Sequence, residues 1–191
     1  MALTKLNFTG QPTLPSASMP TGSVIQTVYV PVTDFGAMAG VDVPTNFTAL
    51  PNFEASITRT INSSKIMVIT DFAGSSLNGT RFQLQRKIGS GSYTEVYVGT
   101  TGTQNERTST DQVFSTIYGS SSVNGNYYAV NRMHSSFVDN PTSGSDAITY
   151  RLTYANHAAG HDFRFNTDGS NDTTNYSRVA MSSFTLQEIK G

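Results

Sequence analysis

The chain of 191 residues contains no cysteine and no tryptophan. Without cysteine it can form no disulfide, no thiolate metal site and no cysteine nucleophile. It also has few charges: 13% of its residues are charged, against about 25% in an average soluble domain. Because the net charge is −1, there is no basic field to attract a phosphate backbone. We therefore expect no nucleic-acid partner.

Long apolar runs are missing as well. No stretch of about 18 apolar residues is present, so the sequence predicts no membrane-spanning helix. Residues 1–20 lack the continuous apolar segment of a signal peptide. We expect a protein that has no membrane partner, is made in a cytoplasm and is not exported through a signal peptide.

The sequence is instead rich in Ser, Thr, Asn and Gly, which favour turns and strands over helices. Polar and apolar residues alternate at 53–60, 81–87 and 147–155, and residues 65–72 are apolar enough for a strand buried on both faces. Further strands are expected at 24–30, 112–118, 127–139, 161–166 and 182–190. Nine or ten short strands separated by turn residues predict an all-β fold, an antiparallel β-sandwich in the form of a jelly roll.

Residues 1–22 have a different composition from the rest. Their three prolines, which fix φ and remove backbone donors, predict an extended segment and not a helix. Apolar side chains are spaced among polar ones at Leu3, Leu6, Phe8 and Leu14. Such a segment is either a disordered tail or an arm that lies on another surface. We expect residues 1–22 to be an attachment arm and residues 23–191 to form a single β-sandwich domain.

One short segment is similar in sequence to a nucleotide-binding loop. Residues 88–99 read IGSGSYTEVYVG, close to the glycine-rich loop of protein kinases, G-x-G-x-x-G-x-V. Thr94 occupies the place of the third glycine, no strand lysine follows, and the DFG triplet at 34–36 precedes the loop instead of following it. The segment therefore predicts a β-hairpin with its loop at 89–92.

The remaining candidates for chemistry are weak. His157 and His161 are four residues apart beside Asp162, a zinc-binding spacing on a helix. However, Gly160 and the flanking strands predict a loop there, and His134 falls within an expected strand. No serine elbow and no particular carboxylate pair stands out. We expect no catalytic residue, no metal, no cofactor and no enzymatic activity.

Tyrosines recur near loop ends and within strands, for example at Tyr93, Tyr150 and Tyr154. Exposed tyrosines beside Asn and Ser suit sugar or protein surfaces. Alternatively, they fill a core that has no tryptophan.

Five segments, read in order, carry a resemblance to a known group. They are GSVIQTVYV, FTALPNFEASITRTINSSKIMVITDF, RFQLQRKIGSGSY, SFVDNPTSGSDAITYRLTYANH and SSFTLQEIKG. Together they resemble bacteriophage virion-appendage proteins of the tail-fibre type, common among phages of aquatic bacteria. Where that group has an R-D-G-like hairpin this chain has RKIGSGSY, and residues 100–126 match no part of the pattern. The resemblance implies a structural role, a homotrimer and no catalytic residues.

On this basis we expect a compact knob of a phage virion appendage, made in the host bacterial cytoplasm. Its N-terminal arm would join other virion proteins, and a host surface glycan is its possible target. Two alternatives stay open. One is a capsid decoration or cement protein, and the other is a free carbohydrate-binding or glycan-hydrolysing domain.

Overall fold

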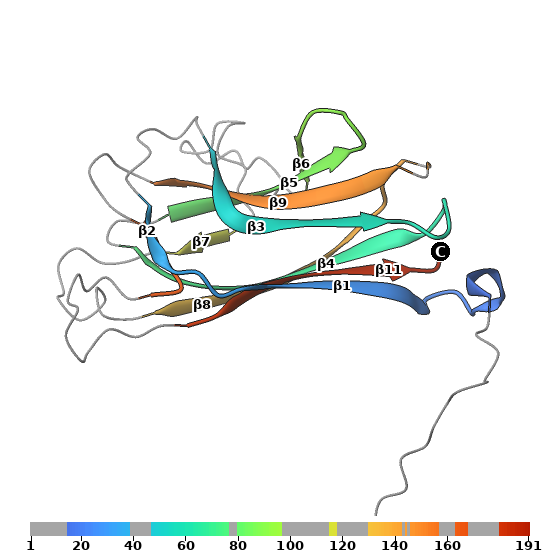
Figure 1. Ribbon diagram of the computed structural model, residues 1–191, viewed down its shortest axis with the longest axis horizontal. Helices are drawn as coiled ribbons and strands as arrows, with labels where there is room; N and C mark the ends of the chain where they lie inside the picture. Colours follow the sequence, from blue (N-terminus) through green and yellow to red (C-terminus); the bar gives the residue numbers. More distant parts are fainter. Residues whose placement is uncertain are drawn as a thin grey trace, which may run out of the picture.

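The protein folds into two antiparallel β-sheets that lie face to face, as the computed structural model in Figure 1 shows. The structure describes residues 15–38, 47–76, 80–96, 115–117, 130–142, 144, 146–156, 163–167 and 180–191. The predicted all-β antiparallel sandwich is confirmed.

Sheet A contains six strands. They are β1 (Val24–Val32), β2 (Gly36–Met38), β4 (Lys65–Ser76), β8 (Asn131–Asp139), β10 (Phe163–Phe165) and β11 (Ser182–Ile189). β11 pairs with β1 on one side and β4 on the other, and β8 pairs with the far side of β4. β10 pairs with residues 74–76 of β4, on the same side of β4 as β11. β2 in turn pairs with β10.

Sheet B contains five strands. They are β3 (Thr48–Thr58), β5 (Thr80–Ile88), β6 (Thr94–Val96), β7 (Ser115–Ile117) and β9 (Ala147–Asn156). The order is β3–β9–β5, and β6 and β7 both pair with β5, at residues 84–86 and 80–82.

The strand order identifies the sandwich as a jelly roll. One sheet holds β1, β11, β4 and β8, and the other holds β3, β9, β5 and the β6–β7 edge. These strands are numbered 1 to 8 in chain order, with β6 and β7 counted as one and β2 and β10 left out. The strand orders of the two sheets are then 1-8-3-6 and 2-7-4-5. This arrangement of eight antiparallel strands in two sheets is a jelly roll.

The core lies between the sheets and is held by aromatic contacts. The ring of Phe72 in sheet A lies 5.1 Å from Phe53 and 4.9 Å from Phe82, both in sheet B, measured between centroids. Phe163 on β10 packs 5.6 Å from Phe72. The alternation predicted for β3 is confirmed by its burial pattern. In β9 the inward residues are buried, but Thr149 and Thr153, predicted to face the other way, are buried too. Each buried Phe contributes about 1.5–3 kcal/mol through burial alone.

Prolines and a bulge mark the edge strands. Pro31 lies in β1, which is an edge of sheet A, as predicted from its missing backbone donor. Pro51 lies in β3, an edge of sheet B, where the register shifts between Ala49 and Glu54. Asn52 adopts a positive φ of 61° within this irregularity, which curves the strand over the end of the sandwich.

The structure corrects three local predictions. β4 is buried on one face only, since Met67 and Ile69 are half-exposed on the other. β2 was not predicted, because its short run of small residues has no alternation. Gln83, predicted to be exposed, is buried.

The described part of the N-terminal arm is not wholly extended. Ser16–Ser18 form a one-turn 3₁₀-helix, η1, and the Ser18 N–H donates to the Pro15 carbonyl (2.8 Å). Proline lacks a donor but keeps its acceptor, so Pro15 can begin a turn. The boundary between arm and domain at residue 22 stays a prediction.

Candidate functional site

The residues predicted for attachment, Leu3, Leu6, Phe8 and Leu14, lie outside the described residues, as do His157, His161 and Asp162. His134 is on β8 and is exposed. Within the part of the chain that the structure describes, no group of three or more His, Asp or Glu could hold a metal ion. None of the described helices has the length and hydropathy needed to cross a membrane.

The base of the arm is fastened to the end of the sandwich. The Lys190 ammonium donates to the carbonyls of Ala17 (2.6 Å) and Met19. Backbone hydrogen bonds from Gly22 to Lys190 (2.8 Å) and from Lys190 to Ser23 (2.9 Å) continue the β1–β11 pairing. The chain that precedes residue 15 therefore departs from a fixed point, beside the C-terminus and beyond the end of β1 (Figure 1).

A buried carboxylate ties this same end together. Glu188 on β11 accepts hydrogen bonds from the backbone N–H groups of Thr60 and Ile61 (2.9 Å each), from Ser64, and from the Gln26 amide (2.7 Å). Burial alone would raise the pKa of Glu188, but these hydrogen bonds outweigh it and lower the pKa below its ordinary value of 4.5. The ionised carboxylate thus joins both edge strands and the β3–β4 turn.

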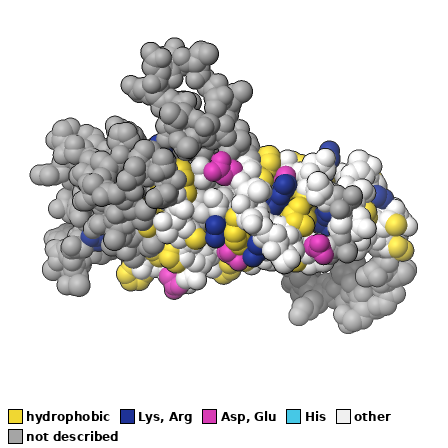
Figure 2. Space-filling model, turned by 90° about the horizontal axis from the view of Figure 1, so that it is seen from above, with side chains coloured by type: hydrophobic (Ala, Val, Ile, Leu, Met, Phe, Trp, Pro, Cys, Tyr) yellow, Lys and Arg dark blue, Asp and Glu magenta, His cyan; other side chains and the backbone are white. Residues whose placement is uncertain are grey.

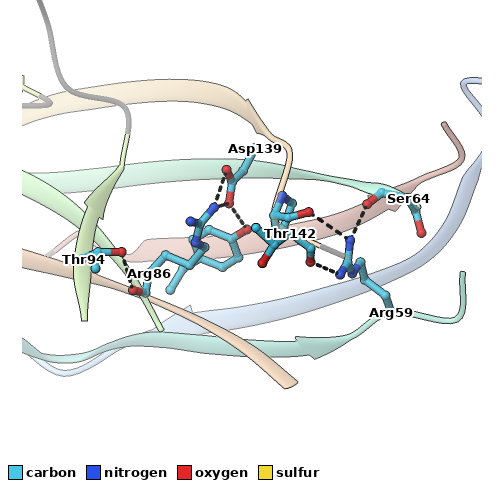
Figure 3. A network of polar contacts seen from close by, with 8 residues as sticks. Arg59, Ser64, Arg86, Thr94, Asp139 and Thr142 are labelled. Atoms are coloured by element: carbon cyan, nitrogen blue, oxygen red, sulfur yellow. Dashed lines mark hydrogen bonds and ion pairs between the residues drawn. The ribbon is translucent and has the colours of Figure 1, made fainter. Parts of the chain in front are cut away.

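A second polar network joins the two sheets (Figure 3). Arg86 on β5 donates to both oxygens of Asp139 on β8 (2.8 and 2.7 Å), and the Tyr150 hydroxyl donates to Asp139 Oδ2 (2.6 Å). Burial and the hydrogen bond to Asp139 raise the pKa of Tyr150, so the hydroxyl stays protonated as a donor. The buried tyrosine confirms the core interpretation for this position.

Arg59 fills the space next to this network. Its guanidinium, buried at the end of β3, donates to the carbonyls of Ser64 (3.1 Å), Thr142 (2.6 Å) and Gly144 (3.0 Å). It therefore holds the β8–β9 connection against the β3–β4 turn. Both arginines are occupied by partners within the chain, so the networks contribute to the structure of the sandwich.

The kinase-like segment is a hairpin, as predicted. β5 and β6 pair antiparallel, and Gly89, with a positive φ of 55°, donates its N–H to the Ala147 carbonyl (2.9 Å). The loop is thereby attached to β9, and its glycine serves the turn.

The outer face of sheet B is polar. One row of residues crosses four strands on this face, namely Glu54, Arg151, Gln85 and Glu95 in register. Arg151 Nε donates to Gln85 Oε1 (2.9 Å), and in the adjacent row the hydroxyls of Ser56 and Thr149 are 2.8 Å apart. Figure 2 looks down on this side of the molecule, where basic and acidic side chains are interspersed.

Tyr93 lies across this row. It belongs to the loop of the β5–β6 hairpin, and its hydroxyl donates to Glu54 Oε2 on β3 (2.7 Å). The guanidinium carbon of Arg151 lies 3.6 Å from the ring centroid, and Lys87 Nζ lies 4.8 Å from it. Desolvation and the hydrogen bond to Glu54 raise the pKa of Tyr93 to about 12.

The outer face of sheet A is apolar by comparison. Among the described residues, the large hydrophobic side chains that are most exposed all lie on or beside this sheet. They are Val24 (47%) and Tyr29 (54%) on β1, Phe35 (61%) after β1, Val138 (52%) on β8 and Met181 (47%) before β11. Half-exposed Met67 and Ile69 lie between the two edges on β4. The ion pair of Arg132 with Asp71 (3.0 Å) neutralises two of the few charges there.

Neither outer face was predicted as a surface. In the sequence, Tyr29 and Val138 have apolar neighbours and do not stand out as exposed, and Glu54, Tyr93 and Arg151 are far apart. The alternation of polar and apolar residues at 81–87 and 147–155 does predict that Gln85 and Arg151 face outward. Pairing β3 with β9 and β9 with β5 was needed to bring them into one row.

No protein-family model and no curated protein matches the chain. Solved structures that resemble it include a chain of infectious bursal disease virus, Gx strain, at 11% identity and a TM-score of 0.41, covering 85% of this chain and 40% of that one. The VP2 subviral particle of infectious bursal disease virus gives 12% identity and a TM-score of 0.40, covering 86% and 41%. This chain therefore spans about two fifths of the length of the viral chains.

A third structure is the CBM22-1 xylan-binding domain of Xyn10C from Paenibacillus barcinonensis. It has 11% identity and a TM-score of 0.35, covering 91% of this chain and 99% of that one. Similarities this distant decide nothing about function, and the fold assignment rests on the strand order described above.

Proposed function

We propose that the protein is a structural component of a bacteriophage virion, a compact appendage knob that works as a homotrimer. The observation that carries this proposal is the contrast between the two faces, because the most exposed apolar side chains gather on sheet A and the outer face of sheet B is polar. An exposed apolar face on a β-protein marks a surface that is covered in the assembled state. The order of the five resembling segments supports the phage assignment.

The occupant of sheet A is a second and a third copy of this chain. In a ring each copy uses two different patches, one for each neighbour. Exposed apolar side chains lie at two separate places on the sheet, with Tyr29 on the β1 edge and Val138 on the β8 edge. Because few unpaired charges lie between them, three such faces can close around an axis without like-charge repulsion.

The arm completes the attachment. Lys190 fixes its base at one end of the sandwich, so Leu3, Leu6, Phe8 and Leu14 are presented from a defined position to other virion proteins. In this arrangement the knob has no catalytic role, and the outer face of sheet B is turned toward solvent.

The oligomer is tested by light scattering of the full-length chain during size-exclusion chromatography. We expect a trimer, and the double variant Tyr29→Ser/Val138→Ser should elute as a monomer that keeps the circular-dichroism spectrum of the wild type. The control Glu95→Ser, an exposed change on the other sheet, should stay trimeric. A monomeric wild type, or a double variant that remains trimeric, contradicts the proposed packing.

Labelled antibodies test the position on the particle. Label at the tail supports the appendage, label over the capsid faces supports a decoration protein instead, and no label on particles contradicts a virion role.

A further inference from the structure

The outer face of sheet B holds a side-chain cluster that the fold does not require. It consists of Glu54, Tyr93, Arg151, Gln85 and Lys87, which come from three strands and one hairpin. None of the five is buried. Each contact in the cluster nevertheless fixes a side chain that would otherwise move freely in water, at an entropic cost.

Arg151 is the most constrained member. Its guanidinium carbon lies over the Tyr93 ring, 3.6 Å from the centroid, and its Nε donates to Gln85. Neither of its Nη groups has a hydrogen-bond partner among the described residues. A guanidinium held in this way presents two parallel donors in a fixed direction, which is the arrangement a binding site needs before its ligand arrives.

In the two rows that carry the cluster the charges balance. Arg151 and Lys87 are positive, and Glu54 and Glu95 are negative. An anionic ligand would meet the two carboxylates, and a cationic ligand would meet the two cations. Adjacent donors and acceptors suit a group that both donates and accepts, and hydroxyls do so.

We propose that this cluster binds a neutral saccharide through a pair of neighbouring hydroxyls. One hydroxyl accepts from the Nη groups of Arg151, and the other donates to the carboxylate of Glu54. Tyr93 is a positioning residue that holds Glu54 by its hydroxyl and Arg151 by its ring. The inference rests on the proposed function, in which this face is turned outward toward a host surface.

The test is a saturation-transfer difference NMR titration of the full-length protein. The probes are neutral trisaccharides of glucose, mannose, galactose and xylose, with the trimers of galacturonic acid and of glucosamine as charged comparisons. We expect at least one neutral trisaccharide to bind and both charged trimers to bind more weakly. Arg151→Gln should weaken the binding about tenfold or more, since it removes a charged donor.

Two further variants separate this site from a general effect on the fold. Tyr93→Phe keeps the ring under Arg151 but frees Glu54, so its affinity should lie between those of the wild type and Arg151→Gln. Lys65→Gln, an exposed change on β4 in the other sheet, should bind like the wild type. Binding of none of the neutral trisaccharides, preference for a charged trimer, or unchanged binding by Arg151→Gln overturns the proposal. Each of these results leaves the trimer and the position on the virion untouched, so the two failures can be told apart.

Discussion

At the scale of single residues, the fold depends on a few buried polar groups that fasten strands distant in sequence. Asn166 is one of them. Its side-chain amide donates to the carbonyls of Val32 and Asp34 (2.7 Å each), and its carbonyl oxygen accepts from Ser182. Buried polar groups that are fully hydrogen-bonded specify one arrangement of the strands, because any other leaves them unpaired.

Glu188 gives the clearest prediction at this scale. Its pKa is lowered in the folded state, so ionised Glu188 stabilises the protein above the pKa of the unfolded chain. This contribution is lost as the pH falls through the folded pKa. We expect Glu188→Gln to lower the free energy of unfolding at pH 7 by about 2 kcal/mol, measured by urea denaturation.

The difference between wild type and Glu188→Gln should shrink as the pH falls from about 4.5 toward 3. Glu95→Gln, which changes an exposed carboxylate, should differ from the wild type by less than about 0.5 kcal/mol at every pH. If Glu188→Gln lowers the free energy of unfolding equally at pH 7 and pH 3, the ionised carboxylate does not stabilise the fold.

At the scale of elements, η1 and the ends of β1 and β11 act as one unit. Lys190 holds the η1 carbonyls, and the backbone of residues 22–23 pairs with it. We expect Lys190→Ala to speed amide hydrogen exchange at Ser18 and Met19 by about tenfold or more while the thermal midpoint changes little, because only the arm base is released. Lys65→Ala, at an exposed position of β4, is the matched control. Unchanged exchange at Ser18 in Lys190→Ala would mean that the lysine does not hold the arm.

Comparison of the predicted and observed strands shows which elements the sequence could predict. β9 and β11 were predicted with nearly correct bounds, whereas β3 was predicted to begin at Phe53 and begins at Thr48, before its irregular segment. β2 was missed because its three residues are too few to show an alternation, and it is identified in the structure by its pairing with β10. The exposed apolar side chains of sheet A could not be predicted, since β1 changes phase at a bulge between Val24 and Gln26 and meets β11 about 160 residues later.

At the scale of the whole molecule, the jelly roll separates two surfaces of different character on its two sheets. Sheet A carries exposed apolar side chains at both edges, and the arm leaves from its end. Sheet B carries the polar cluster around Tyr93 and Arg151. An assembly that buries the first surface leaves the second outward, so one chain can both build a particle and contact what lies outside it.

The proposed place of this chain in a phage particle is tested most directly by a cryo-electron-microscopy reconstruction of that particle. The account predicts density for three jelly rolls around one axis at an appendage, with Tyr29 and Val138 buried between copies and the Tyr93–Arg151 cluster facing solvent. Particles without such density, or copies whose sheet A faces solvent, would contradict it.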